Sequence, residues 1–155
     1  MKPTTTSPQT IAVFVRRLTA SGAPAIIEAP RGGLESPALL ASLARRGWFA
    51  ARVDRAPLID KATVLHGFYQ AGCFPAYFGF NWDALTDMLS DLSWLRAQDR
   101  EPAGIAFIVA HSQTLALRSP NVLTTLTDIV ADVAATRLAA QKPPIVLALE
   151  QTKDE

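Results

Sequence analysis

The stretch FPAYFGFNWDALTDMLSDL, from Phe74 to Leu92, joins an aromatic, glycine-containing segment to a run with helical periodicity. Asn81 is a favourable N-cap residue, and it directly precedes that run. Asp83, Asp87 and Asp91 recur every four residues, so a helix places them on one face. The opposite face is apolar and consists of Leu85, Met88, Leu89 and Leu92. We therefore predict a short helix whose aspartates are exposed and whose apolar residues are buried.

The acidic face of this helix has no compensating cation in the stretch, which contains neither Lys nor Arg. Like charges four residues apart destabilise a helix by a few tenths of a kcal/mol per pair. Asp83 lies in the first turn, where the helix dipole favours a negative charge, but Asp87 and Asp91 lie too far along the helix to benefit. These carboxylates are therefore predicted to face a positively charged partner.

Known catalytic and metal-binding patterns do not fit these residues. Carboxylates in a row along one helix point outward, whereas the ligands of Mg²⁺ or Ca²⁺ converge. A paired-carboxylate hydrolase needs two acids that face each other across a cleft at about 5 to 10 Å. The sequence has no Gly-x-Ser-x-Gly motif, phosphate-binding loop or dinucleotide fingerprint, and the isolated His66 and His111 are interpreted as structural. We predict no enzyme activity, no metal site and no cofactor.

The run from Phe74 to Leu85, followed by Asp87, resembles the signature of the barstar family, small intracellular inhibitors of secreted guanyl-specific ribonucleases. That signature is an aromatic pair, Gly, any residue, Asn, an apolar residue, Asp-Ala-Leu and a further Asp. The match has no gap, and weaker similarity extends from about Phe49 to about Leu149. The resemblance implies a protein that blocks the phosphate-binding active site of a basic ribonuclease with helix carboxylates. This role covers that of an immunity protein, which inhibits the ribonuclease of a toxin pair.

The resemblance also implies roles for individual residues. Asp87 would enter among the cations of the enzyme, and Asp83 would reach the loop that reads guanine. Asp128 is a candidate for a further acidic contact, with a solvated helix face as the alternative. Gly79 could also serve an unusual backbone angle or a close approach, and Asn81 the helix cap. The predicted partner-binding residues are Tyr77, Gly79, Phe80, Asn81, Asp83, Asp87, Asp91 and Asp128.

Two positions depart from a well-known family pattern, and they suggest a different cognate enzyme. Phe80 stands where that pattern has Glu, which replaces a charge at the rim by an apolar contact. Thr86 stands where it has Trp, which removes an aromatic side chain. We expect Phe78, Trp82 or both to pack inward and Tyr77 to be exposed. The alternative function is a non-catalytic interaction or regulatory module on a barstar-like fold with a different basic partner.

Strand and helix signals alternate along the chain, which indicates an α/β fold. We predict a parallel sheet of about four strands packed with helices, which is also the barstar-like expectation, with an N-terminal βα extension. Residues 11–18 are compatible with either a strand or a short helix. The predicted strands cover residues 25–29, 48–53, 104–110 and 145–149, and the predicted helices begin after Ser36, Asp60, Asn81 and Ser119.

Length and composition favour one compact domain over residues 1–155, since hydrophobic residues make up 49% of the 155. We divide it into residues 1–10, expected to be frayed, an extension over 11–47 and a barstar-like core over 48–150. No apolar run or N-terminal segment predicts a membrane span or a signal peptide, so we expect a cytoplasmic protein. Cys73, the single cysteine, excludes an intramolecular disulfide and is expected to be buried.

The formal net charge is only +1, but basic residues predominate in the first 62 residues and acidic residues in the rest. The arginines of the basic part are spread over separate predicted elements without interleaved aromatic residues. We therefore predict no direct binding of nucleic acid. The expected partner is a basic protein, and the free protein is expected to be a monomer.

Overall fold

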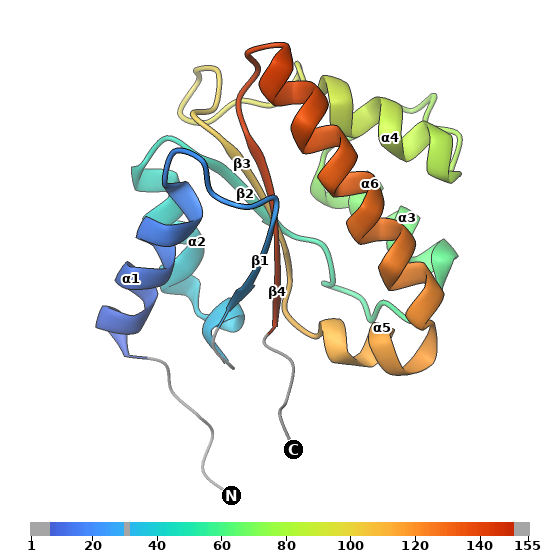
Figure 1. The fold of residues 1–155 in the computed structure, drawn as a ribbon, viewed down its shortest axis with the longest axis horizontal. Coiled ribbons are helices and arrows are strands. Elements are labelled where there is room, and N and C mark those ends of the chain that lie inside the picture. The colour runs from blue at the N-terminus through green and yellow to red at the C-terminus, as the bar shows by residue number, and fades with distance from the viewer. Residues whose placement is uncertain (1–6, 30–31, 151–155) are drawn as a thin grey trace, which may run out of the picture.

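The structure is a computed structural model that describes residues 7–29 and 32–150. Its centre is a four-stranded sheet in the order β1-β4-β3-β2, in which all neighbouring strands are parallel (Figure 1). The predicted α/β class and the four parallel strands are therefore confirmed. The strands are β1 (Ile26–Ala29), β2 (Phe49–Arg52), β3 (Ile105–Val109) and β4 (Ile145–Glu150).

The two central strands are apolar along their length because both of their faces are covered. Every residue of β3 is buried, as are the first five residues of β4. Their register pairs Ile105 with Ile145 and Phe107 with Leu147. Because successive side chains alternate between the faces, Phe107 contributes to one hydrophobic core and Ile108 to the other.

Helices cover both faces of the sheet (Figure 1). On one side lie α1 (Pro8–Thr19), α2 (Pro37–Arg45) and the short 3-10 helix η1 (Gly33–Glu35). On the other side lie α3 (Lys61–Ala71), α4 (Trp82–Asp91) and α6 (Pro120–Ala139), with α5 (Ser112–Arg118) at one end of the sheet. No helix within residues 7–29 and 32–150 is long and apolar enough to span a membrane.

Local cap chemistry explains where several helices begin, and these starts agree with the sequence prediction. Ser36 Oγ accepts a hydrogen bond from the backbone N–H of Ala38 at 3.2 Å. Asp60 Oδ1 accepts one from the N–H of Thr63 at 2.9 Å, and the Thr63 hydroxyl accepts one from the N–H of Asp60 at 3.0 Å. This reciprocal pair is a capping box, and it fixes the first turn of α3.

The N-terminal extension contains a helix before its strand, so residues 11–18 take the helical one of their two predicted alternatives, and the predicted βα order gains a helix at its start. Ser7 caps α1, so residues 8–10, expected to be frayed, are helical, and residues 11–18 continue the same helix. Residues 1–6 lie outside the described part. The order is therefore helix, strand, helix, and β1 pairs with β4 at one edge of the sheet. Pro30, which directly follows the strand predicted over residues 25–29, also lies outside the described residues.

Two further expectations are wrong. The strand predicted over residues 104–110 is shorter, because β3 ends at Val109, and the chain continues through His111 into α5, a helix that the sequence did not predict. Cys73 was expected to be buried, but it is exposed in the turn after α3, with a φ of 53°. The side chain of Cys73 is exposed although that of the neighbouring Phe74 is buried.

Candidate partner-binding site

The acidic face of α4 has the predicted orientation. Asp83, Asp87 and Asp91 are exposed, while Leu85, Met88, Leu89 and the following Leu92 are buried. The prediction of which side chains are exposed is thereby confirmed. Within the described residues none of the three aspartates forms a salt bridge, and the exposed carboxylates of Asp83 and Asp87 remain available to a partner.

The loop before α4 is held to the helix by Asn81. Its Oδ1 accepts a hydrogen bond from the backbone N–H of Ala84 at 2.7 Å, which confirms the N-cap. Its Nδ2 donates to the carbonyl oxygen of Gly79 at 3.3 Å. A Cβ atom on Gly79 would lie 3.3 Å from that Nδ2, so the suggested close approach is present. The suggested unusual backbone angle is wrong for Gly79, because the left-handed residue is Phe80, with a φ of 52°.

The aromatic residues of the loop separate into buried and exposed side chains. Phe78 is buried and packs against Phe74, with ring centroids 5.0 Å apart, whereas Trp82 is half-buried. Tyr77 is 74% exposed and Phe80 is 42% exposed. The inward packing of Phe78 and the exposure of Tyr77 are confirmed. The exposed loop therefore offers apolar surface beside the carboxylates of α4.

The C-terminal end of α4 is held by Arg137 of α6, a residue that the sequence analysis did not single out. The Arg137 side chain is almost fully buried, and its Nη1 donates to the carbonyl oxygens of Leu89, Ser90 and Asp91 at 3.2, 3.2 and 3.0 Å. Its Nε donates to the carbonyl oxygen of Pro143 at 3.0 Å. A cation at the end of a helix satisfies free carbonyl groups and complements the helix dipole.

Arg137 gives Asp91 surroundings different from those of the other two aspartates. Burial lowers the pKa of Arg137, and the negative charges of Asp91 and Glu101 oppose that effect. Asp91 Oδ1 also accepts a hydrogen bond from the backbone N–H of Ser93 at 3.2 Å. Asp91 therefore helps to stabilise the charge of Arg137 inside the fold. The sequence analysis missed this role, because it considered only the stretch around Asp91, which contains neither Lys nor Arg.

The remaining predicted positions lie apart from this cluster or have local roles. Asp128 is exposed on α6, the helix that packs against α4, and no described contact joins its side chain to the aspartates of α4. The hydroxyl of Thr86 donates to the carbonyl oxygen of Trp82, one turn earlier, at 3.1 Å. Thr86 therefore presents neither an aromatic ring nor a free hydroxyl hydrogen to a partner.

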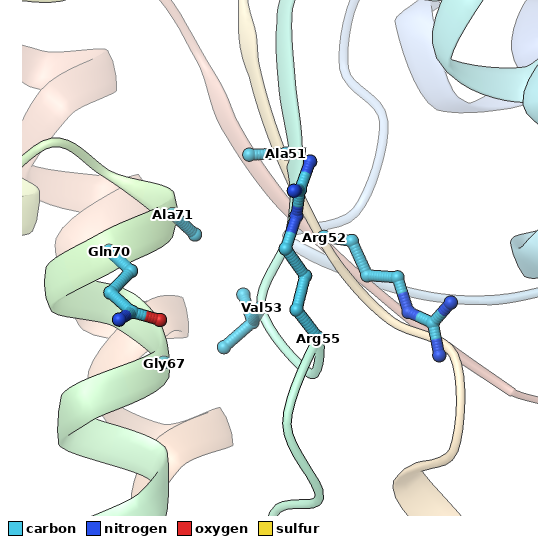
Figure 2. Close-up of a pocket in the computed structure, with 7 residues that line it drawn as sticks. All are labelled: Ala51, Arg52, Val53, Arg55, Gly67, Gln70 and Ala71. Atoms are coloured by element: carbon cyan, nitrogen blue, oxygen red, sulfur yellow. The ribbon is translucent and has the colours of Figure 1, made fainter.

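Other polar clusters lie outside the predicted surface. A pocket of about 300 Å³ is lined by residues of β2, α3 and the chain after β2, and Figure 2 shows Gln70 of α3 on one side and Arg55 on the other. Asp54 is buried, and it accepts hydrogen bonds from Arg52 Nε at 2.9 Å and from the N–H groups of Ala110 and His111 at 3.1 and 2.8 Å. Asp54 thus joins the ends of two strands. Across residues 7–29 and 32–150, no His, Cys, Asp and Glu side chains gather as a metal-binding group.

Comparison with known proteins identifies the family of the chain. No curated protein matches at a significant level. A family model described as "Barstar (barnase inhibitor)" matches residues 48–150, which is well over half of the chain. The matched region includes β2, β3, β4, the aromatic loop and the acidic helix α4, and it begins after the N-terminal extension. The chain therefore belongs to the barstar family.

Proposed function

We propose that this protein inhibits a guanyl-specific ribonuclease by covering its active site. Ribonucleases hold the phosphodiester and stabilise the transition state with Arg, Lys and His side chains. Carboxylates on a rigid helix can take the position of the phosphate and accept charge-assisted hydrogen bonds from those cations. Asp87 is assigned to the centre of this contact and Asp83 to the guanine-reading loop. The protein needs no catalytic activity for this function.

The observation that carries the proposal is the exposure of Asp83 and Asp87 on one face of α4, with no cation paired to either carboxylate in the part of the chain that the structure describes. The repulsion between these like charges destabilises α4 in the unbound protein, and a basic partner removes this repulsion. The family match, which spans the whole of α4, supports a ribonuclease as that partner.

The anchoring of α4 supports the proposal further. Asn81 fixes the first turn, and Arg137 fixes the last one. Lys142 Nζ also donates to the carbonyl oxygen of Ser90 at 2.8 Å. A helix that is held at both ends loses little conformational freedom when it binds, so more of the interaction energy contributes to affinity.

Charge pairs of this kind are strong when they become buried. Coupling energies of about 1.5 to 7 kcal/mol have been measured for close charge pairs in the barnase–barstar complex itself, and we adopt that range rather than derive it. Tyr77, Gly79 and Phe80 are assigned to contacts around the charges, and Asp128 to a contact at the edge.

We place the protein in the cytoplasm of the cell that makes the enzyme, as its immunity protein.

The test is a titration of a panel of guanyl-specific ribonucleases, beginning with barnase, with cleavage of RNA as the measurement. The wild-type protein should inhibit at least one enzyme with one-to-one stoichiometry. The double variant Asp83→Asn, Asp87→Asn should lose inhibition. The matched control is Glu28→Gln, which removes one exposed charge from β1, away from α4. Failure to inhibit any enzyme of the panel contradicts the proposal and favours an interaction module with a different basic partner.

A further inference from the structure

Side chains of α3 and of the loop before α4 meet in one cluster of rings on the surface. The ring centroid of Phe80 lies 5.4 Å from that of His66 and 5.1 Å from that of Tyr69. His66 is exposed, Tyr69 is half-buried, and Phe80 keeps 42% of its surface exposed. Beneath them, the buried Phe78 lies 4.7 Å from Phe80 between ring centroids. We call His66, Tyr69 and Phe80 the aromatic patch.

The backbone at Phe80 indicates that the ring has a purpose besides packing. A φ of 52° lies in the left-handed region, where Gly or Asn is favoured and a bulky residue is an outlier. A fully buried ring could offset that cost, but the ring of Phe80 is only partly buried. Strained residues of this kind concentrate at functional sites, where the surrounding structure holds them in place. Here His66 and Tyr69 supply that support.

We propose that the aromatic patch is an apolar subsite of the ribonuclease contact and takes an apolar side chain of that enzyme. This inference rests on the proposed inhibitory function and specifies the chemistry of the Phe80 contact, whose ring α3 supports. Phe80 directly precedes the N-cap Asn81, so one partner can touch Phe80 and Asp83 together. Phe80 makes the contact, whereas His66 and Tyr69 position its ring.

The chemistry of the patch favours an apolar group over a cation. His66, Tyr69 and Phe80 carry no negative charge, so a cation brought here would lose water without gaining an ion pair from the patch. An apolar or aromatic side chain gains from the removal of both surfaces from water and from packing against the ring. The patch therefore distinguishes enzymes by the apolar residue that they present opposite Phe80, next to the cations that α4 binds.

The experiment measures Kd for the ribonuclease of the panel that the wild-type protein inhibits most tightly. Phe80→Ala should weaken binding about tenfold or more, the range of an interfacial hot spot. Phe80→Leu should retain most of the affinity, and His66→Ala should lose an intermediate amount. The matched control is Leu117→Ala, because Leu117 is 82% exposed on α5, away from α4 (Figure 1). Leu117→Ala should bind like the wild type.

Salt dependence separates a direct apolar contact from an indirect electrostatic effect. The loss caused by Phe80→Ala should be the same at low and high salt, whereas the loss caused by Asp87→Asn should shrink as salt screens the charges. Thermal unfolding of each variant tests folding, and Phe80→Gln replaces Phe80→Ala if the latter does not fold.

The outcomes distinguish this inference from the function on which it rests. If Asp87→Asn abolishes inhibition while Phe80→Ala and Phe80→Gln bind like Leu117→Ala, the patch is not a contact and the inhibitory function stands. A salt-dependent loss for Phe80→Ala also overturns the apolar contact. If the wild-type protein inhibits no enzyme of the panel, the proposed function and the patch fail together.

Discussion

Asp87 and Asp91 are chemically identical residues one helical turn apart, but their surroundings differ. Asp87 is exposed and pairs with no described cation. Asp91 lies near the buried guanidinium of Arg137, whose charge it helps to stabilise, and it accepts a hydrogen bond from Ser93. The acidic face therefore has a free end and a structural end. Sequence spacing predicted the face but could not predict this division, because Arg137 is distant in the sequence.

We predict that Asp87→Ala weakens ribonuclease binding by about 2 to 5 kcal/mol, because the cations of the enzyme remain buried without a partner. Asp91→Ala should weaken binding by only about 0 to 1 kcal/mol, as expected for a screened pair at a rim. It should lower the free energy of unfolding instead, since Arg137 loses a nearby negative charge. Inhibition titrations and urea unfolding measure the two effects. Equal binding losses would show that the wrong carboxylate has been placed at the centre.

Asp60 makes the stability of α3 dependent on pH. Hydrogen bonds from the backbone and side chain of Thr63 lower the pKa of Asp60 below its usual value. A lowered pKa in the folded state stabilises the protein above the unfolded pKa, and this contribution disappears as the pH falls through the folded pKa.

We therefore predict that wild-type protein is more stable than Asp60→Asn at neutral pH and that the difference shrinks as the pH falls below about 3.9, the unfolded value. Asn caps helices nearly as well as Asp, so this comparison isolates the charge. Urea unfolding from neutral to acidic pH measures the free energies. A difference that is constant with pH would contradict the prediction.

At the scale of elements, α4 is anchored through its backbone at both ends. The N-terminal anchor, Asn81, was predicted because its hydrogen bonds reach only neighbouring residues. The C-terminal anchor, Arg137, donates three hydrogen bonds to carbonyl groups almost fifty residues earlier in the chain. No local pattern contains that information, because the pairing depends on how α6 packs against α4.

We predict that Arg137→Met lowers the free energy of unfolding by about 2 to 4 kcal/mol, because the carbonyl groups of α4 lose a charged donor. Hydrogen exchange should accelerate in the last turn of α4 but not in β3. Arg137→Lys keeps the charge and part of the hydrogen bonding, so its loss should be smaller. Unchanged exchange in α4 for Arg137→Met would show that the helix end does not depend on this residue.

At the scale of the whole molecule, the N-terminal extension covers one face of the sheet. Its helices bury Ile108, Val146 and Ala148, and β1 pairs with β4. We predict that a chain lacking residues 1–47 exposes this apolar face, binds a hydrophobic dye and associates in solution. Size-exclusion chromatography and dye fluorescence are the measurements. A truncated protein that is monomeric and binds no dye would contradict this prediction.

The intact chain should unfold in a single transition, as one domain.

The sequence predicted those parts of the fold whose cause is local. Apolar runs predicted β3 and β4, and cap residues predicted the starts of α2, α3 and α4. The exposed Asp83 and Tyr77 followed from helical spacing and from the usual packing of aromatic side chains. The support of Phe80 by His66 and Tyr69 was missed because it depends on the tertiary placement of α3. The short helix α5 was missed because it has only seven residues and no side-chain cap marks its start.

The anchoring of α4 through main-chain carbonyls has an evolutionary consequence. Arg137 and Lys142 bind the helix by atoms that every amino acid shares, so this support does not depend on which side chains stand at positions 83 and 87. Under the proposed function, mutations at those positions can change the choice of ribonuclease without removing this support. Recognition residues can then be altered one at a time while the anchoring of α4 is kept.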